Sequence, residues 1–299
     1  MNYRDFFGCA YPIVAAPMNR VSDAKLAIAC HNAGIFPSLS LYSWQSRHSI
    51  DINENIVDRE LKTFQDATGS SKVLLSLASV NLFKDSVMKL LLDNHIEFLE
   101  FIASDHPPKF FIDKTKTIKQ QMKDRHGVDF KIMTKRLDSQ NINANSVDAI
   151  MYKTGDGAGR GLPSANILNE LEKFKNIYPT IPVIMSGGVG CADDVKKYMS
   201  LGCMAVCIGT LLAASEESSV SRETKLKMVE ATVADISRTA VSQQSALIFS
   251  KLRSHDLNNT NSLIKGIAGP DQGLIFAGKG IDYVKEIRPV KDIIQELVS

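Results

Sequence analysis

Eight short apolar runs alternate with helix-like stretches between residues 12 and 209. In chain order the runs are IVAA, IFPSLSL, KVLLSLAS, EFLEFIAS, FKIMTK, DAIMYKT, PVIMSG and MAVCIG. The stretch FKDSVMKLLLDNH has apolar residues at Phe83, Val87, Leu90 and Leu91, the spacing of an amphipathic helix. Continuous apolar strands alternating with helices are typical of parallel strands buried on both faces. The pattern therefore predicts an α/β fold, a (β/α)8 TIM barrel.

After Thr210 the pattern becomes helical, first in RETKLKMVEATVADISRTAV and QSALIFSKL and finally in the terminal stretch VKDIIQELV. The 299 residues exceed the roughly 200–250 that a single barrel needs. We therefore expect residues 1–214 and 276–299 to form the barrel. Residues 215–275 are expected to form a small helical insert, or lid, after the eighth strand and within the same domain.

Composition excludes several classes of partner. Lys plus Arg is 35 and Asp plus Glu is 33, so a net charge of +2 makes no electrostatic case for nucleic acid or an anionic membrane. The five cysteines form no C-x-x-C pair, which favours buried reduced thiols over a disulfide framework or a metal site. The N-terminus lacks the apolar core of a signal peptide, and no apolar run approaches about 18 residues. We expect a cytoplasmic protein without a metal site.

Two glycine-containing loops follow the seventh and eighth predicted strands, SGGVG at residues 186–190 and IGT at residues 208–210. Glycine lets backbone N–H groups approach an anion closely, and the Thr210 hydroxyl adds a donor. In TIM barrels the loops after these two strands commonly form a phosphate site. The two loops together therefore predict phosphate binding, with simple tight turns as the alternative.

Two further loops carry weaker signals. APMN at residues 16–19, after the first strand, offers an apolar floor for a flat ring, although an ordinary apolar turn explains it equally well. KTGDGAGRG at residues 153–161, after the sixth strand, is a flexible backbone loop with charged side chains. It is neither a Walker loop nor a dinucleotide fingerprint. We interpret it as a loop that contacts the ligand, with a solvated turn as the alternative.

Several motifs occur together in a fixed order: PIVAAPM, SVNLF at residues 79–83, the glycine loop at 155–161, IPVIMSGGVGCADDVKKYMSLGCMAVCIGTLLAASEES and the late GLIFAGKGI. In this order they resemble the nitronate monooxygenase (2-nitropropane dioxygenase-like) family of FMN-dependent TIM-barrel enzymes. That family includes the flavin-dependent enoyl-acyl-carrier-protein reductases. The resemblance spans nearly the whole chain and is most specific over residues 181–217.

The resemblance implies that FMN is the cofactor and that its phosphate lies on the loops after strands seven and eight. The implied phosphate contacts are Ser186, Gly187, Gly188, Gly209 and Thr210. The flavin ring is implied to lie near Pro17 and Met18, with Asn81, Lys135, Ala158 and Gly159 as further contacts.

One position departs from the family pattern, which usually reads E-A-G-G-H after strand six with the histidine as catalytic base. Here Asp156 stands for the acid, and the histidine position falls on Arg160, or on Gly159 after a one-residue shift. Arginine stays charged and cannot accept a proton at neutral pH. His106, after the fourth strand, is the candidate replacement base, with a surface histidine as the alternative.

The tryptophan and five of the histidines are interpreted as residues that serve packing rather than ligand binding or catalysis. Trp44 could stack on a ligand, but a packed loop tryptophan is the commoner case. The histidines without glycine or cofactor context are treated as structural: His31, His48, His95, His126 and His255.

We expect an FMN-dependent oxidoreductase with Arg160 and His106 as candidate catalytic residues. Its substrate is small and anionic, or an acyl chain. The alternatives are an NAD(P)H-dependent enoyl-thioester reductase, a flavin-binding accessory protein without the family chemistry, and a phosphate-sugar barrel enzyme without flavin. Dioxygen or NAD(P)H is the expected redox partner, and a homodimer is left open.

Overall fold

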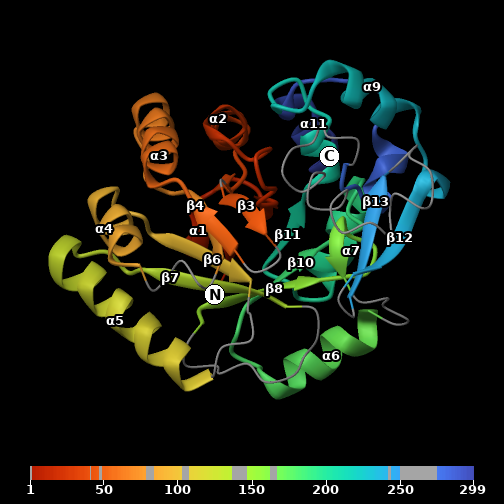
Figure 1. Cartoon of the computed structure of the whole chain (residues 1–299). Coiled ribbons are helices and arrows are strands. Elements are labelled where there is room, and N and C mark those ends of the chain that lie inside the picture. The colour runs from red at the N-terminus through yellow and green to blue at the C-terminus, as the bar shows by residue number, and fades with distance from the viewer. Residues whose placement is uncertain are drawn as a thin grey trace.

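Eight parallel strands form the centre of the molecule and confirm the predicted TIM barrel (Figure 1). The computed structural model describes residues 2–40, 42–46, 49–78, 84–102, 108–136, 147–161, 167–241, 244–249 and 275–299. Some of these residues, including Gly159, Arg160 and nearly all of the insert hairpin, are described by their backbone alone. The barrel strands are β1 (Ile13–Ala15), β2 (Ser38–Leu39), β5 (Leu74–Ala78), β6 (Phe98–Ile102), β7 (Lys131–Arg136), β8 (Ala149–Lys153), β10 (Val183–Ser186) and β11 (Ala205–Ile208).

The spatial order of the strands is β1-β11-β10-β8-β7-β6-β5-β2, and every adjacent pair is parallel. A parallel bridge between Val14 and Phe36 joins the two ends of this series. The Phe36 N–H donates to the Ile13 carbonyl at 2.9 Å, and the Ala15 N–H donates to the Phe36 carbonyl at 2.8 Å. The sheet is therefore closed, and the C-terminal ends of all eight strands meet at one rim.

Helices surround the barrel (Figure 1). They are α2 (Ala24–Asn32), α3 (Glu54–Thr68), α4 (Asp85–Asp93), α5 (Pro108–His126), α6 (Ile167–Ile177), α7 (Ala192–Ser200), α8 (Thr210–Ala213) and α11 (Val290–Leu297). Side-chain caps begin two of them, since Asp23 accepts from the Leu26 N–H and Asn53 accepts from the Ile56 N–H. The helices predicted over 83–95 and at the C-terminus are confirmed by α4 and α11.

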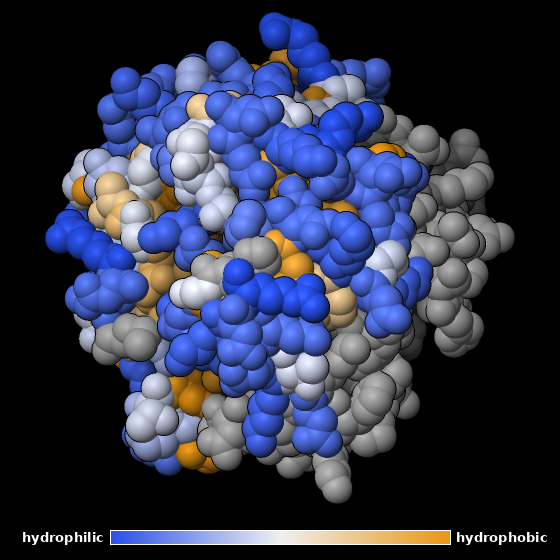
Figure 2. Space-filling view, turned by 90° about the vertical axis from the view of Figure 1, so that its left-hand side faces the viewer, coloured by the Kyte–Doolittle hydropathy of each residue, from blue (hydrophilic) through white to orange (hydrophobic). Residues whose placement is uncertain are grey.

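The face that carries α3, α4 and α5 is mostly hydrophilic, with apolar residues in small patches (Figure 2). Ion pairs one helical turn apart lie on it, between Lys62 and Asp58 in α3 and between Lys89 and Asp93 in α4. Such pairs are typical of solvated helix faces. Among the described residues, no helix combines the length and the apolar character needed to cross a membrane.

The barrel interior is apolar at its N-terminal end. Strand residues such as Leu74, Phe98, Met133 and Ile184 form an inner cluster separate from the one between strands and helices. The short helix α1 (Tyr3–Phe7) adds Phe7, whose ring centroid lies 4.5 Å from that of Phe36. Aromatic rings therefore close the end of the barrel opposite the rim, and a ligand can reach the interior only from the C-terminal ends of the strands.

The insert contains strands as well as helix, so its predicted helical character is wrong in part. Helix α9 (Arg222–Glu230) and the 3-10 turn η2 (Val233–Asp235) are followed by β12 (Ile236–Val241) and β13 (Gln244–Phe249), an antiparallel pair. Thr232 begins η2 with a capping box, because its N–H donates to the Asp235 carboxylate at 2.9 Å. The β-branched side chains of β12 then favour the extended backbone. Residues 250–274 lie outside the described residues.

The remaining elements lie outside the barrel sheet. They are the antiparallel pair β3 (Tyr42–Ser46) and β4 (Ser49–Ile52), strand β9 (Gly159–Gly161), and the 3-10 helix η3 (Lys279–Tyr283). Of the five cysteines, Cys30, Cys203 and Cys207 are buried, as predicted, whereas Cys9 and Cys191 are half-buried.

One packing contact between α2 and α3 is expected to make stability depend on pH. The His31 ring lies edge-on to Phe64, with ring centroids 5.8 Å apart, and burial lowers the pKa of His31 below its usual 6.5. The unfolded chain therefore binds the proton first as the pH falls. We expect stability to decrease as the pH drops from about 6.5 through the lower folded-state pKa.

The measurement is the urea unfolding midpoint at pH 7.5 and 5.5. His31→Gln should reduce the difference between the two midpoints, whereas His95→Asn, at an exposed histidine, should leave it as in the wild type. A wild-type difference that survives in the His31 variant would assign the effect to another group.

Candidate active site

The loops after β10 and β11 lie side by side, because Ser186 and Cys207 are register partners at the ends of these strands. Gly187 and Gly188 have φ values of +107° and +76°, in the region that favours glycine. A Cβ on Gly187 would lie 2.8 Å from the Gly157 Cα, and one on Gly188 would lie 2.9 Å from the Asp156 Cβ. The loop after β8 therefore packs directly on the loop after β10, and only glycine fits between them.

The backbone of these loops offers hydrogen-bond donors. Within the part of the chain that the structure describes, nothing accepts a hydrogen bond from the N–H groups of Gly187, Gly188 or Gly209. The Thr210 Oγ1 accepts from the Gly278 N–H at 3.0 Å, which leaves the hydroxyl proton to be donated elsewhere. Several N–H groups and a hydroxyl at one rim form a site that suits an anion such as a phosphate.

The loop after β1 joins this rim. A Cβ on Gly209 would lie 3.4 Å from the Met18 Sδ and 3.2 Å from the Ala16 Cβ. The Ser22 hydroxyl holds the loop, because it donates to the Ala16 carbonyl at 2.9 Å and accepts from the Met18 N–H at 3.0 Å. Pro17 is buried and Met18 half-buried. The structure thus places both predicted ring contacts beside the predicted phosphate loops.

A C-terminal segment, residues 278–280, completes the rim, and the sequence did not predict its part. The Lys279 N–H donates to the Asp156 carbonyl at 3.0 Å, and the Lys279 Nζ lies 2.9 Å from the Asp156 Oδ1. A Cβ on Gly278 would lie 2.4 Å from the Asp156 carbonyl oxygen, and one on Gly280 would lie 3.0 Å from the Val189 carbonyl oxygen. The motif GLIFAGKGI is one of those that carry the family resemblance, but its sequence did not indicate that it would contact the loop after β8.

Lys135, predicted as a flavin contact, is the residue before the last in β7 and lies on the inward face of the barrel. Its Nζ lies 3.4 Å from the Oε1 of Glu100, a fully buried carboxylate on β6. Cys207 lies near both groups, and burial raises the pKa of its thiol to about 11. A thiol with so high a pKa is not a nucleophile at neutral pH, so Cys207 serves packing.

The glycine loop after β8 continues into β9, where Arg160 is the register partner of Ala246 and Gly159 that of Leu247 in β13. The insert hairpin is thereby joined to the loop that carries Arg160, predicted as a catalytic residue. Ala158 contacts the C-terminal segment, since its N lies 3.0 Å from the ideal Cβ position of Gly278. The Arg160 side chain, Asn81 and His106 lie outside the described residues, so their predicted roles stay predictions.

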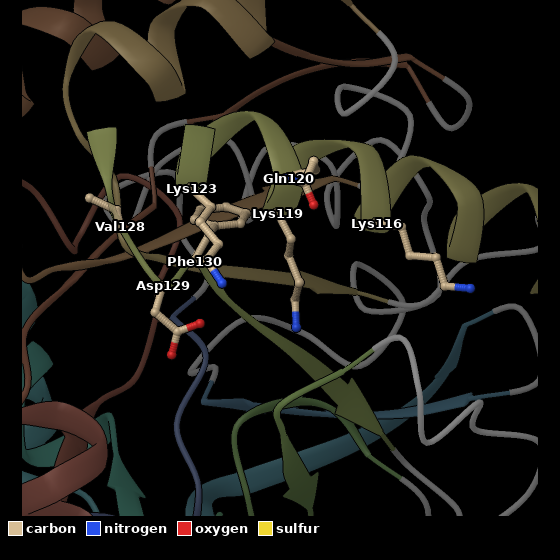
Figure 3. Close-up of a pocket in the computed structure, with 7 residues that line it drawn as sticks. All are labelled: Lys116, Lys119, Gln120, Lys123, Val128, Asp129 and Phe130. Atoms are coloured by element: carbon tan, nitrogen blue, oxygen red, sulfur yellow. The ribbon is translucent and has the colours of Figure 1, made fainter. Parts of the chain in front are cut away.

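A separate pocket lies far from this rim, between α5 and the residues that lead into β7 (Figure 3). Its lining residues are Lys116, Lys119, Gln120, Lys123, Val128, Asp129 and Phe130. It adjoins the N-terminal end of β7, the end of a TIM barrel that serves stability rather than chemistry. The Lys119 Nζ is already paired with Asp148 at 2.6 Å. No described group of three or more His, Cys, Asp or Glu residues is placed to hold a metal ion.

The chain is similar to known proteins at two levels. A sequence model of the IMP dehydrogenase / GMP reductase domain matches residues 7–271. The inosine-5'-monophosphate dehydrogenase of Helicobacter pylori (strain ATCC 700392 / 26695) is 36% identical over 95 residues, which are 29% of this chain and 19% of that protein. This chain thus matches only about a fifth of the length of that curated relative.

Solved structures match over nearly the whole chain. FabK from Thermotoga maritima has a TM-score of 0.77 at 20% identity, with 98% of this chain and 93% of that chain covered. A nitroalkane oxidase from Streptomyces ansochromogenes has a TM-score of 0.72 at 18% identity, covering 97% and 95%. The enoyl reductase domain of MlnA from Bacillus amyloliquefaciens has a TM-score of 0.73 at 9% identity, covering 99% and 95%. At these identities the likeness shows the fold. The dehydrogenase, the oxidase and the reductase are oxidoreductases by name.

Proposed function

The chain belongs to the IMP dehydrogenase / GMP reductase domain family, and we propose that it is an FMN-dependent oxidoreductase acting on a small anionic substrate. The observation that carries the proposal is the pair of glycine loops at the ends of β10 and β11. Their N–H donors have no acceptor among the described residues, and Gly187 and Gly188 leave no room for a side chain. The oxidoreductase names of the structures with the same fold agree with this function.

The residues present fit FMN. Ser186, Gly187, Gly188, Gly209 and Thr210 would hold its phosphate, and Pro17, Met18, Lys135, Ala158 and Gly159 would contact the rest of the molecule, with Asn81 as a further contact. FMN, when bound, supplies the transfer of electrons to and from the substrate. The protein's residues bind and orient the ring, exclude water from it, and place positive charge at the rim.

The substrate class follows from the charged residues at the rim. Arg160 occupies the position that in the resembling family belongs to a histidine base, and a guanidinium can hold a carboxylate or nitronate by paired hydrogen bonds. Lys279 adds a second cation, partly balanced by Asp156. We therefore propose an anionic substrate, with His106 as the other candidate catalytic residue.

We also propose that residues 215–275 act as a lid within the same domain. The pairing of β13 with β9 supports this, because it connects the insert to the loop that carries Arg160.

A redox partner, dioxygen or NAD(P)H, completes the proposed reaction. Mixing the reduced protein with air, and the oxidised protein with NADH or NADPH, distinguishes the two by the rate at which flavin absorbance returns or disappears.

The cofactor is tested by releasing it. We expect the purified protein to be yellow and to yield FMN rather than FAD on heating, because the rim offers one phosphate site and no second glycine fingerprint for an adenylate. Chromatography of the released compound against both standards makes the measurement. FAD, or a protein that neither retains nor takes up flavin, would contradict the proposal.

A second candidate function is a phosphate-substrate enzyme without flavin, favoured by the family match and by the IMP dehydrogenase relative. In that case the same loops would hold the phosphate of a nucleotide substrate. A colourless protein whose thermal midpoint rises with IMP but not with FMN would support this candidate against the first.

A further inference from the structure

An ion pair lies inside the barrel just below its rim. The Glu100 side chain is 0% exposed and that of Lys135 is 16% exposed, and the Lys135 Nζ lies 3.4 Å from the Glu100 Oε1. The Ser76 hydroxyl on β5 donates to the Glu100 Oε2 in a short hydrogen bond. Among the described residues no hydrogen bond reaches the Oε1, so its contact is the ammonium of Lys135. Three neighbouring strands thus build one fixed charged unit.

This unit lies at the boundary between the apolar and the polar part of the interior. On the same strands, the inward residues nearer the N-terminal ends are Leu74, Phe98 and Met133, all fully buried or nearly so. Nearer the rim, just after β2, the Ser40 hydroxyl is buried without a hydrogen-bond partner in the described structure. The Ser38 hydroxyl, also buried without a described partner, lies at the level of Leu74. The pair therefore lies on the rim side of the apolar layer that Leu74, Phe98 and Met133 form.

Further polar groups lie around the pair on β8, which adjoins β7, and on β10 and β11. Cys207 on β11 lies close to both members of the pair. Burial raises the pKa of its thiol, the charge of Lys135 lowers it, and the charge of Glu100 raises it further. Lys153 on β8 and Ser186 on β10 act on the same thiol, Lys153 through its charge and Ser186 through a hydrogen bond. The ammonium of Lys135 thus points toward the barrel axis, beneath the predicted ligand loops.

Stability does not explain why a charged pair occupies this place. Removing two charges from water is unfavourable, and apolar residues of similar volume often give an equally stable core. A fixed charge at a binding site, by contrast, needs a partner that holds it in one position. The position of the pair at the rim therefore favours a role toward the ligand.

We infer that Glu100 is a positioning residue, which holds the Lys135 ammonium inside the barrel so that it contacts the flavin from below the rim. This inference rests on the proposed FMN-dependent function. Lys135 supplies the contact, and Glu100, with Ser76, fixes its direction.

The test is a double-mutant cycle with Glu100→Gln and Lys135→Met, read by the FMN dissociation constant and by the absorbance spectrum of the bound flavin. Each single variant should raise the dissociation constant about tenfold or more, as expected for the loss of a charged hydrogen bond. The double variant should be no worse than Lys135→Met, because Glu100 acts through Lys135. Glu100→Asp should restore part of the affinity and of the wild-type spectrum.

The matched control is Asp129→Asn. It breaks the ion pair between Asp129 and Lys131, 3.0 Å apart at the other end of the same strand, and should leave flavin affinity and spectrum unchanged. Ser76→Ala weakens the same unit without removing a charge, and it replaces Glu100→Gln if that variant does not fold. Wild-type affinity and spectrum in Glu100→Gln, together with a defect in Lys135→Met, would overturn the inference.

A measurement without flavin separates this inference from the proposed function. Acetic anhydride acetylates only uncharged amines, and a neighbouring carboxylate favours the charged form. In the flavin-free protein, the Lys135 side chain itself, read separately from that of Lys131, should be acetylated faster in Glu100→Gln than in the wild type or Asp129→Asn. Equal rates would overturn the inference even if FMN binds. If Lys135 is labelled faster in Glu100→Gln but the wild-type protein binds no FMN, the two results separate. The absence of FMN binding would overturn the proposed function, and the faster labelling would still show that Glu100 holds Lys135.

Discussion

Replacing Gly188 with valine is expected to weaken FMN binding at least about a hundredfold, so that the protein purifies colourless. At its φ of +76° a β-branched residue is strongly disfavoured, and a Cβ would lie 2.9 Å from the Asp156 Cβ. The loops after β8 and β10 would have to separate, and the N–H donors would no longer converge on one anion. Gly187→Val should act in the same way, because its Cβ would meet the Gly157 backbone at 2.8 Å.

The measurement is the ratio of flavin to protein absorbance after dialysis against excess FMN, with circular dichroism to verify the fold. Gly69→Val is a matched control. Gly69 ends α3 at a φ of +66°, so the variant suffers comparable backbone strain, but no heavy atom lies within 4 Å of its Cβ position. It should lose some stability and keep its flavin. Full flavin content in both loop variants would mean that the phosphate binds elsewhere.

The barrel could be predicted from the sequence because each of its strands is buried on both faces. Such strands appear in the sequence as short apolar runs. Strands β6 and β10 could therefore be predicted without knowing which strands they pair with. The insert had no such signal. Residues 236–241 contain Ile, Thr and Val among polar residues, and their strand depends on pairing with β13 and, through it, with β9. That pairing is tertiary and the local pattern does not contain it.

The candidate site shows the same division. Gly187, Gly188 and Gly209 could be identified because glycine at a strand end has a local conformational meaning. The contact of Lys279 with Asp156 joins residues more than 100 positions apart, and no spacing rule predicts it. Glu100 did leave a signal, a single charged residue on the inward face of an otherwise apolar strand. Its partner Lys135 was assigned to the flavin, and only the structure shows that the two residues form a pair.

Neutral nitroalkanes are expected to be poor substrates of the wild-type protein, whereas preformed nitronates and other small anions are turned over. A neutral nitroalkane must first lose its α-proton, and a positioned base contributes about 10²–10⁴-fold to such a step. Arg160 stands at the position of the base in the resembling family and cannot accept the proton. Strand β9 fixes this position, because the Arg160 backbone pairs with Ala246 of the insert hairpin.

Arg160→His is therefore expected to raise kcat/KM for neutral nitroalkanes by about 10²–10⁴-fold and to raise KM for anionic substrates. Arg160→Lys is the matched control, since it keeps a positive charge without supplying a base at neutral pH, and it should retain anion turnover without the gain. The pH profile of the histidine variant should acquire a new limb near the pKa of a histidine.

Vigorous wild-type turnover of neutral nitroalkanes that disappears in His106→Ala would assign the base to His106 instead. Unchanged kinetics in Arg160→Ala on every substrate would remove Arg160 from the site, because a guanidinium that binds the substrate anion cannot be lost without a rise in KM.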